Sequence, residues 1–289
     1  MSTPLIVERT IVGLRRRVAE LRRRGLAVGL VPTMGALHAG HISLVDAARA
    51  RGDATVATIF VNPTQFGANE DLAAYPRDET VDFALLESAG ATLAFAPSVE
   101  EMYPERGLTT IHVAELTDGL CGPLRPGHFD GVATVVTKLF LAALPDRGYF
   151  GEKDYQQLQM VKRLSRDLNM PIEVVGCPTV REPDGLAMSS RNRYLSPAER
   201  AAAPAMRRAL GALAEAARAG ADCRRAEVAA RSALATAGFE PIDYVAVVDA
   251  DTLALVDRIA KPARALAAAW LGKARLIDNV AVLREADRI

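Results

Sequence analysis

The sequence AVGLVPTMGALHAGH, residues 27–41, decides the fold. Its first five residues are a short apolar run between Gly25 and Pro32, which is typical of a buried β-strand. A glycine-containing turn follows, and residues 42–50 then have the apolar spacing of a helix. Because a buried strand followed directly by a helix is the repeating unit of parallel sheets, this stretch predicts an α/β protein.

The same alternation continues to about residue 176. We expect further strands at 54–61, 92–95, 149–150 and 172–176, and helices at 80–89, 132–144 and 155–168. Near the N-terminus, Ile11, Leu14, Val18 and Leu21 fall at helical spacing and predict an amphipathic first helix. The order predicts a Rossmann-like parallel sheet with helices on both faces.

The pattern changes after about residue 180. Ser196 and Glu199 form a capping box with proline at the first helical position, which predicts a helix to about Gly220. Asp222 is the expected cap of a second helix that ends near Gly238. Strands are expected at 242–248, 264–271 and 273–277. We therefore predict two domains, 1–179 and a smaller α+β domain at 180–289.

Composition excludes several classes of protein. Of the 289 residues, 35 are Lys or Arg and 35 are Asp or Glu, so the basic excess of a general nucleic-acid binder is missing. The three cysteines are far apart and have neither disulfide-framework nor zinc spacing. We expect no secretory signal, since the N-terminus lacks the required apolar segment, and no membrane span. The expectation is a cytoplasmic protein that binds neither membranes nor nucleic acid.

The first candidate site is the turn that holds His38 and His41, two of only four histidines. The turn follows a strand and opens a helix, where free N–H groups and the positive end of the helix dipole suit a polyphosphate. Imidazoles three residues apart can both donate hydrogen bonds to charge that grows at phosphorus. The alternative is a pair of surface histidines in a turn.

Two more motifs stand where ligands are expected. Lys153 and Asp154, in FGEKDYQQ, follow a strand end; the lysine suits a phosphate and the carboxylate suits Mg²⁺. Ser189, Ser190 and Arg191 lie in GLAMSSR at the domain junction and could clamp a phosphate. The motif with Lys153 and Asp154 could instead be a solvated charged turn, and the motif with Ser189, Ser190 and Arg191 could instead be a polar linker.

Together these motifs resemble a known pattern. HAGH is similar to the HIGH signature of the nucleotidyltransferase superfamily, and MSSR to its KMSKS counterpart, with Arg191 at the second lysine position. The longer strings VPTMGALHAGH, FVNPTQF, RPGHFDGV, FGEKDYQQL and GLAMSSRNRYL resemble the pantoate–β-alanine ligase family. The resemblance is dense over residues 27–200 and thin beyond.

The resemblance implies a reaction and a set of site residues. Members join pantoate to β-alanine through pantoyl adenylate, with ATP cleaved to AMP and pyrophosphate. It implies that His41 donates a proton, that Gln65 and Gln157 bind pantoate, and that Gln65 also lies near β-alanine. It further implies a cytoplasmic homodimer that needs Mg²⁺, bound here by Asp154, and a C-terminal domain that covers the active site. The implied ATP-binding residues are Met34, Gly35, Ala36, Leu37, His38, Ala39, Gly40, His41, Gly151, Glu152, Lys153, Asp154, Val180, Met188, Ser189, Ser190 and Arg191, and those expected to be catalytic are His38, His41, Lys153, Ser189, Ser190 and Arg191.

The same motifs are compatible with other functions. Another nucleotidyltransferase that acts on a pantetheine-like phosphate would usually stop after one domain, and a tRNA synthetase would need a basic RNA-binding surface. An inactive nucleotide sensor could have kept the fold. Arg125 and His128 could gate a pocket or be structural, and the loop 75–78 has no assigned role.

Overall fold

A computed structural model describes residues 4–67, 70, 72–105 and 107–283 and divides the chain into two compact units. The first unit comprises Met1–Asp118, Arg125–Glu152 and Met160–Pro178, and the second comprises Gly119–Leu124, Lys153–Gln159 and Thr179–Ile289. The expected domains were contiguous, whereas the second unit also takes up two short stretches from the first 180 residues.

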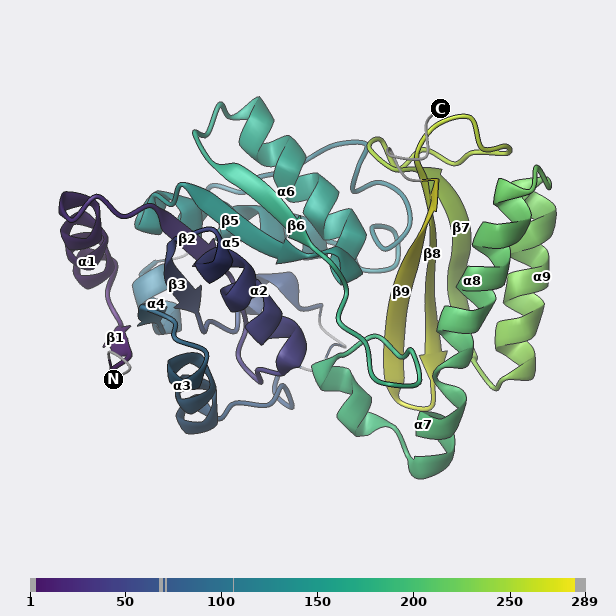
Figure 1. Ribbon diagram of the computed structural model, residues 1–289, viewed down its shortest axis with the longest axis horizontal. Coiled ribbons are helices and arrows are strands. Elements are labelled where there is room, and N and C mark those ends of the chain that lie inside the picture. Colours follow the sequence, from purple (N-terminus) through teal and green to yellow (C-terminus); the bar gives the residue numbers. More distant parts are fainter. Residues whose placement is uncertain (1–3, 68–69, 71, 106, 284–289) are drawn as a thin grey trace. The chain divides into compact units, whose positions relative to one another are not determined.

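The first unit is built on a six-stranded sheet in the order β1-β4-β3-β2-β5-β6, in which every neighbouring pair is parallel (Figure 1). The predicted Rossmann-like parallel sheet is confirmed. Short β1 was not predicted. The strands are β1 (Ile6–Glu8), β2 (Val28–Val31), β3 (Ala54–Thr58), β4 (Leu93–Phe95), β5 (Arg147–Gly151) and β6 (Glu173–Cys177).

Helices cover both faces of this sheet, as predicted. Because parallel crossovers are right-handed, the connections from β2 to β3 and from β3 to β4 place α2 and α3 on one face, while those that lead to β2 and β5 place α1 and α5 on the other. Leu44, Val45 and Leu86 pack against strand residues on the first of these faces. The helices are α1 (Ile11–Arg23), α2 (Ala39–Ala50), α3 (Glu79–Ser88), α4 (Val99–Met102), α5 (His128–Ala143) and α6 (Tyr155–Asp167).

The strand order reverses direction between β2 and β5. From β2 the chain proceeds toward β3 and β4, and from β5 it proceeds the opposite way to β6. Ligands of open α/β sheets bind outside the carboxyl ends of the strands at such a switch point. The strand β2 leads into the histidine turn, and β5 leads into the turn of Lys153, so the topology marks both motifs as candidates.

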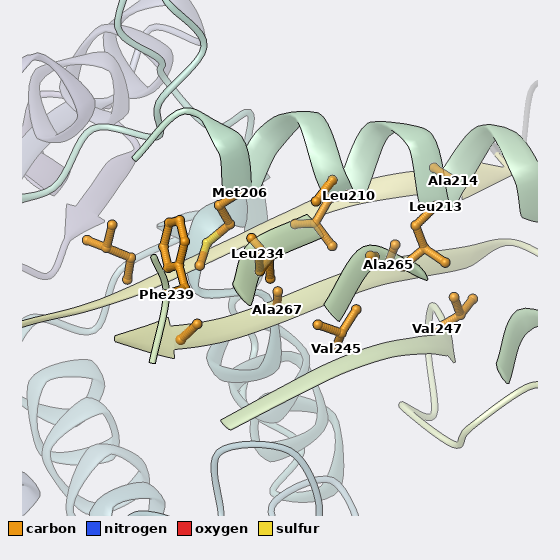
Figure 2. Packing of buried hydrophobic residues seen from close by; sticks show 14 of the residues in the cluster. Met206, Leu210, Leu213, Ala214, Leu234, Phe239, Val245, Val247, Ala265 and Ala267 are labelled. Atoms are coloured by element: carbon orange, nitrogen blue, oxygen red, sulfur yellow. The ribbon is translucent and has the colours of Figure 1, made fainter. Parts of the chain in front are cut away.

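The second unit is built on an antiparallel sheet in the order β7-β8-β9, with β7 (Ile242–Asp249), β8 (Ala263–Leu271) and β9 (Ala274–Leu283). Side chains alternate between its two faces. Ala265 and Ala267 of β8 pack beneath Met206, Leu210 and Leu213 of a covering helix (Figure 2). The predicted smaller α+β domain is thus confirmed, with a third strand longer than expected.

One sequence prediction for this unit was wrong. A single helix was expected from Ser196 to about Gly220, but the structure has α7 (Pro197–Ala202) and α8 (Ala205–Arg218), followed by α9 (Cys223–Thr236). Pro204 causes the break, because proline has no N–H for the helical hydrogen-bond ladder. In the described part of the chain, no helix is long and apolar enough to cross a membrane.

Candidate active site

The histidine turn is held in one conformation by its own side chains. His38 is the N-cap of α2, and its Nδ1 accepts a hydrogen bond from Gly40 N at 3.1 Å. The Nδ1 of His41 accepts from His38 N at 3.3 Å, and the two ring centroids lie 4.1 Å apart. A backbone N–H only donates, so each neutral ring carries its proton on Nε2. The turn therefore presents two Nε2–H donors beside the N-terminus of a helix.

Asp82 of α3 holds the preceding backbone of the turn. Its buried carboxylate accepts from Ala36 N at 2.9 Å and from Leu37 N at 2.8 Å. Gly35 has a φ of +81°, and a Cβ there would lie 2.8 Å from a carboxylate oxygen of Asp82. Sequence reasoning missed Asp82, although an acid among the apolar residues 81–86 was a signal that could have found it.

We expect Asp82→Ala to impair both folding and turnover. The substitution leaves two buried N–H groups without their acceptor, which should lower the free energy of unfolding by roughly 1–3 kcal/mol. Turnover should fall more than thermal stability explains, because the same two N–H groups shape the histidine turn. Denaturant unfolding and initial rates at a temperature where the variant is folded check this; unchanged rates would show that the turn keeps its shape without Asp82.

Gln65 lies next to the histidine turn within the first unit. It ends a short 3₁₀ turn, η1 (Pro63–Gln65), and its Nε2 contacts Met34 Sδ at 3.2 Å. Its Oε1 accepts from Asn62 Nδ2 at 3.1 Å, and Asn62 Oδ1 in turn accepts from the Tyr103 hydroxyl at 3.0 Å. Buried Asn62 thus sets which way the Gln65 amide points. The strand end at Asn62 was visible in the sequence, but nothing there indicated Tyr103.

A second chain of polar contacts fixes the backbone of Gln65. Arg125 makes two hydrogen bonds to Glu70, at 2.6 and 2.7 Å, and its Nη1 lies 2.8 Å from His128 Nε2. Since arginine only donates, His128 accepts at Nε2 and donates from Nδ1 to the Gln65 carbonyl at 2.8 Å. Burial alone would raise the pKa of Glu70, but the hydrogen bonds and charge of Arg125 hold that pKa below its usual value. Arg125 and His128 are therefore positioning residues for Gln65.

Gly131 of α5 leaves room for η1. A Cβ at this position would lie 2.6 Å from the carbonyl carbon of Thr64 and 2.8 Å from Gln65 Cα, which are both backbone atoms. We expect Gly131→Ala to displace η1 and to lower the free energy of unfolding, since overpacking commonly costs about 1–3 kcal/mol. The matched control is Gly211→Ala in α8, where a Cβ would meet only the mobile end of Arg207 at 3.3 Å. Equal free energies of unfolding for the two variants would contradict this close approach of Gly131 to η1.

In the second unit, Lys153 lies in a one-turn 3₁₀ helix, η2 (Glu152–Asp154), between β5 and α6. Burial lowers the pKa of Lys153; Asp154 and Asp278 oppose this effect, and the nearby charge of Arg191 adds to it. Asp154 is exposed, and Gln157 is half-buried in the first turn of α6. Lys153 and Arg191, predicted from separate motifs, are thus within electrostatic range of one another.

The motif that holds Ser189, Ser190 and Arg191 also has a defined backbone conformation. Val180 and Met188 are joined by a hydrogen bond of 3.0 Å from Met188 N to Val180 O, and Arg181 and Ala187 form an antiparallel bridge. Ser189 then caps the 3₁₀ turn η3 (Ser190–Tyr194), where its Oγ accepts from Arg191 N at 3.3 Å. The structure therefore brings Val180 together with the residues 188–191, as one hairpin followed by one capped turn.

A family model described as pantoate-beta-alanine ligase matches residues 6–281. The chain belongs to the pantoate–β-alanine ligase family. The match includes both units and extends through the C-terminal region that the sequence motifs left thin. It follows that the chain is an enzyme, an ATP-dependent ligase of pantoate and β-alanine.

Relatives of this family are similar to the chain over nearly its whole length. The chain is 56% identical to a pantothenate synthetase of Paramagnetospirillum magneticum over 282 residues, which are 98% of this chain and 99% of that protein. The crystal structure of pantothenate synthetase from Thermus thermophilus has a TM-score of 0.89 and 50% identity, with 96% and 99% of the chains covered. A Francisella tularensis pantoate–β-alanine ligase, complexed with beta-gamma ATP and β-alanine, has a TM-score of 0.80 and 32% identity, with 96% and 98% covered.

Asp154, in the turn of Lys153, offers an exposed carboxylate. Among residues 4–67, 70, 72–105 and 107–283, no group of three or more His, Cys, Asp or Glu side chains could hold a metal ion. Mg²⁺ in nucleotide sites commonly uses one or two carboxylates together with phosphate oxygens and waters. The exposed carboxylate of Asp154 is compatible with that mode.

Proposed function

We propose that the histidine turn is where this ligase activates pantoate. The observation that carries the proposal is that both Nδ1 atoms accept backbone N–H groups, which leaves His38 and His41 as Nε2–H donors at a helix N-terminus. The turn also follows β2 at the topological switch point of the sheet. This arrangement suits a polyphosphate whose charge grows during displacement.

The proposed first step is attack of a pantoate carboxylate oxygen on the α-phosphorus of ATP. A bond forms between that oxygen and phosphorus, the bond to the bridging oxygen breaks, and pyrophosphate leaves with the electron pair. His38 and His41 stabilise the developing charge by hydrogen bonds from Nε2–H, and His41, as the proton donor, shares its Nε2–H proton with the departing pyrophosphate oxygen. In the second step the amine of β-alanine attacks the acyl carbon of pantoyl adenylate and loses a proton, and AMP leaves.

The proposed pantoate site uses neutral amides. Gln65, oriented by Asn62, and Gln157 bind pantoate, and Gln65 also lies near β-alanine. Amides can hydrogen-bond hydroxyl and carboxylate oxygens without placing a further charge beside the reacting carboxylate. A site that bonds a substrate hydroxyl also discriminates strongly against analogues without it.

The remaining assigned residues are proposed to hold the nucleotide. Lys153, Ser189, Ser190 and Arg191 bind phosphate oxygens. Asp154 would hold Mg²⁺, which would neutralise part of the triphosphate charge. The residues assigned to contact ATP through backbone or apolar atoms are Met34, Gly35, Ala36, Leu37, Ala39, Gly40, Gly151, Glu152, Val180 and Met188.

Three further parts of the proposal concern the whole protein. We propose that it acts as a homodimer, in the cytoplasm, and with Mg²⁺. The Francisella relative's complex with beta-gamma ATP and β-alanine supports the substrate assignment. The sequence and composition support a protein without nucleic-acid or membrane partners.

The proposal is tested by following the two products separately. With purified protein, ATP and Mg²⁺, pyrophosphate release should require pantoate, and formation of the amide should require β-alanine in addition. Hydroxylamine in place of β-alanine should trap the pantoyl group as a hydroxamate. Pyrophosphate release that is independent of pantoate would contradict the adenylation step and favour a different nucleotidyltransferase.

A further inference from the structure

The sheet of the second unit has one apolar face and one polar face. Even-numbered residues of β9, such as Leu276 and Val280, pack in the cluster beneath α8 and α9, so odd-numbered residues point the other way. That other face carries Asn279 and Arg275 of β9 and Arg264 of β8. Its side chains bond to the two short stretches, 119–124 and 153–159, that join the second unit.

Asn279 contacts the turn of Lys153 directly. Its side chain is almost fully buried, and its Nδ2 donates to the Lys153 carbonyl at 2.9 Å. Its Oδ1 accepts from Arg264 Nη1 at 2.6 Å. Because a guanidinium only donates, Arg264 fixes the amide with its oxygen toward the arginine and its NH₂ toward Lys153.

Tyr155, the first residue of α6 after the turn, is held by Arg264 of the same sheet and by the residue that follows β7. The Arg264 guanidinium carbon lies 4.0 Å from the centre of the Tyr155 ring, and the Tyr155 hydroxyl donates to the Ala250 carbonyl at 2.9 Å. A three-residue 3₁₀ turn such as η2 has few internal hydrogen bonds with which to fix its own position. The position of Lys153 therefore depends on these contacts to the sheet.

The residue beside Asn279 holds the other phosphate-binding motif of this unit. Asp278 accepts two hydrogen bonds from Arg181, at 2.7 and 2.9 Å, and Arg181 opens the hairpin that leads to Ser189. Planar two-point bonding between arginine and a carboxylate fixes orientation as well as distance. Consecutive residues of β9 thus hold the turn of Lys153 and the hairpin before 188–191.

We infer that Asn279, oriented by Arg264, is a positioning residue that acts through Lys153 in the adenylation step. The inference rests on the proposed role of Lys153 in binding ATP phosphate. Asn279 touches the backbone of Lys153, so its loss should shift the ammonium without removing it. A displacement near 1 Å in an active site can lower the rate by about 10²-fold.

The test is a double-mutant cycle between Asn279→Ala and Lys153→Met, followed by pantoate-dependent pyrophosphate release. Asn279→Ala should lower kcat by about 10- to 100-fold with little change in the KM for ATP. In the Lys153→Met background, Asn279→Ala should have no further effect, because coupled residues are not additive.

Two variants separate positioning from stability. Asn279→Asp keeps the shape and the partner Arg264 but cannot donate to the Lys153 carbonyl, so it should also lose turnover. Glu227→Ala is the matched control: Glu227 is buried in the same unit and accepts from the backbone N of Val247 at 2.6 Å, away from Lys153. It should lower the melting temperature without lowering kcat.

Each outcome decides the inference. The positioning role would be overturned if the decreases in kcat of the two single variants multiply in the double variant, or if Asn279→Asp has wild-type kcat. Either result would leave the role of Lys153 intact. A Lys153→Met protein with wild-type turnover would instead remove Lys153 from the proposed mechanism, and the inference with it.

Discussion

Turnover of His41→Ala should fall by about 10²- to 10³-fold while the protein remains folded. The substitution removes one Nε2–H donor, and loss of one such donor to a developing charge costs roughly 3–4 kcal/mol of transition-state stabilisation. The imidazole is only half-buried, and its Nδ1 bond to His38 N is long at 3.3 Å, so stability should change little. Pantoate-dependent ATP–pyrophosphate exchange without β-alanine measures this step directly.

The control for this variant removes an imidazole elsewhere. His112 is exposed, with its Nδ1 2.8 Å from Asp130, and lies outside the histidine turn. His112→Ala should exchange pyrophosphate at the wild-type rate. Wild-type exchange by a well-folded His41→Ala protein would remove His41 from the mechanism.

Replacement of Lys153 by Met should also lower exchange by about 10²- to 10³-fold, and should weaken ATP binding as well. Methionine keeps most of the apolar stem, so the change isolates the ammonium group. Burial already lowers the pKa of Lys153, which means that keeping a cation in this place costs the protein stability. Lys153→Arg should retain more of the affinity for ATP than of the exchange rate, since a guanidinium has a different reach and geometry.

Lys162 provides the matched comparison, because it lies on α6 close to Lys153 in sequence but is exposed. Lys162→Met should leave the affinity for ATP and the exchange rate unchanged. Isothermal titration with a non-hydrolysable ATP analogue gives the affinity, and exchange gives the rate. Identical values for Lys153→Met and the wild type would refute the phosphate role.

The sequence was a good guide to the sheet because the strands β2 and β3 are buried, largely apolar runs with turn residues near their ends. It placed the start of α2 at Ile42, three residues late, because the cap at His38 is formed by imidazoles rather than by the Ser, Thr, Asp or Asn of an ordinary N-cap. The sequence pattern predicted one continuous helix in place of α7 and α8, because the residues on both sides of Pro204 have high helix propensity.

The site was predicted only where residues are close in sequence. His38 and His41, or Ser189 and Arg191, can be paired from spacing. The contacts of Gln65 with His128, and of Lys153 with Asn279, join residues 63 and 126 positions apart. Such pairs depend on how elements pack, which periodicity does not encode, so Asp82, Tyr103 and Asn279 emerged only from the structure.

The most direct test is a crystal structure of the protein with ATP and pantoate bound. The account predicts a nucleotide whose phosphates contact the Nε2 atoms of His38 and His41, with pantoate on Gln65. A nucleotide and pantoate both bound away from the histidine turn would contradict it.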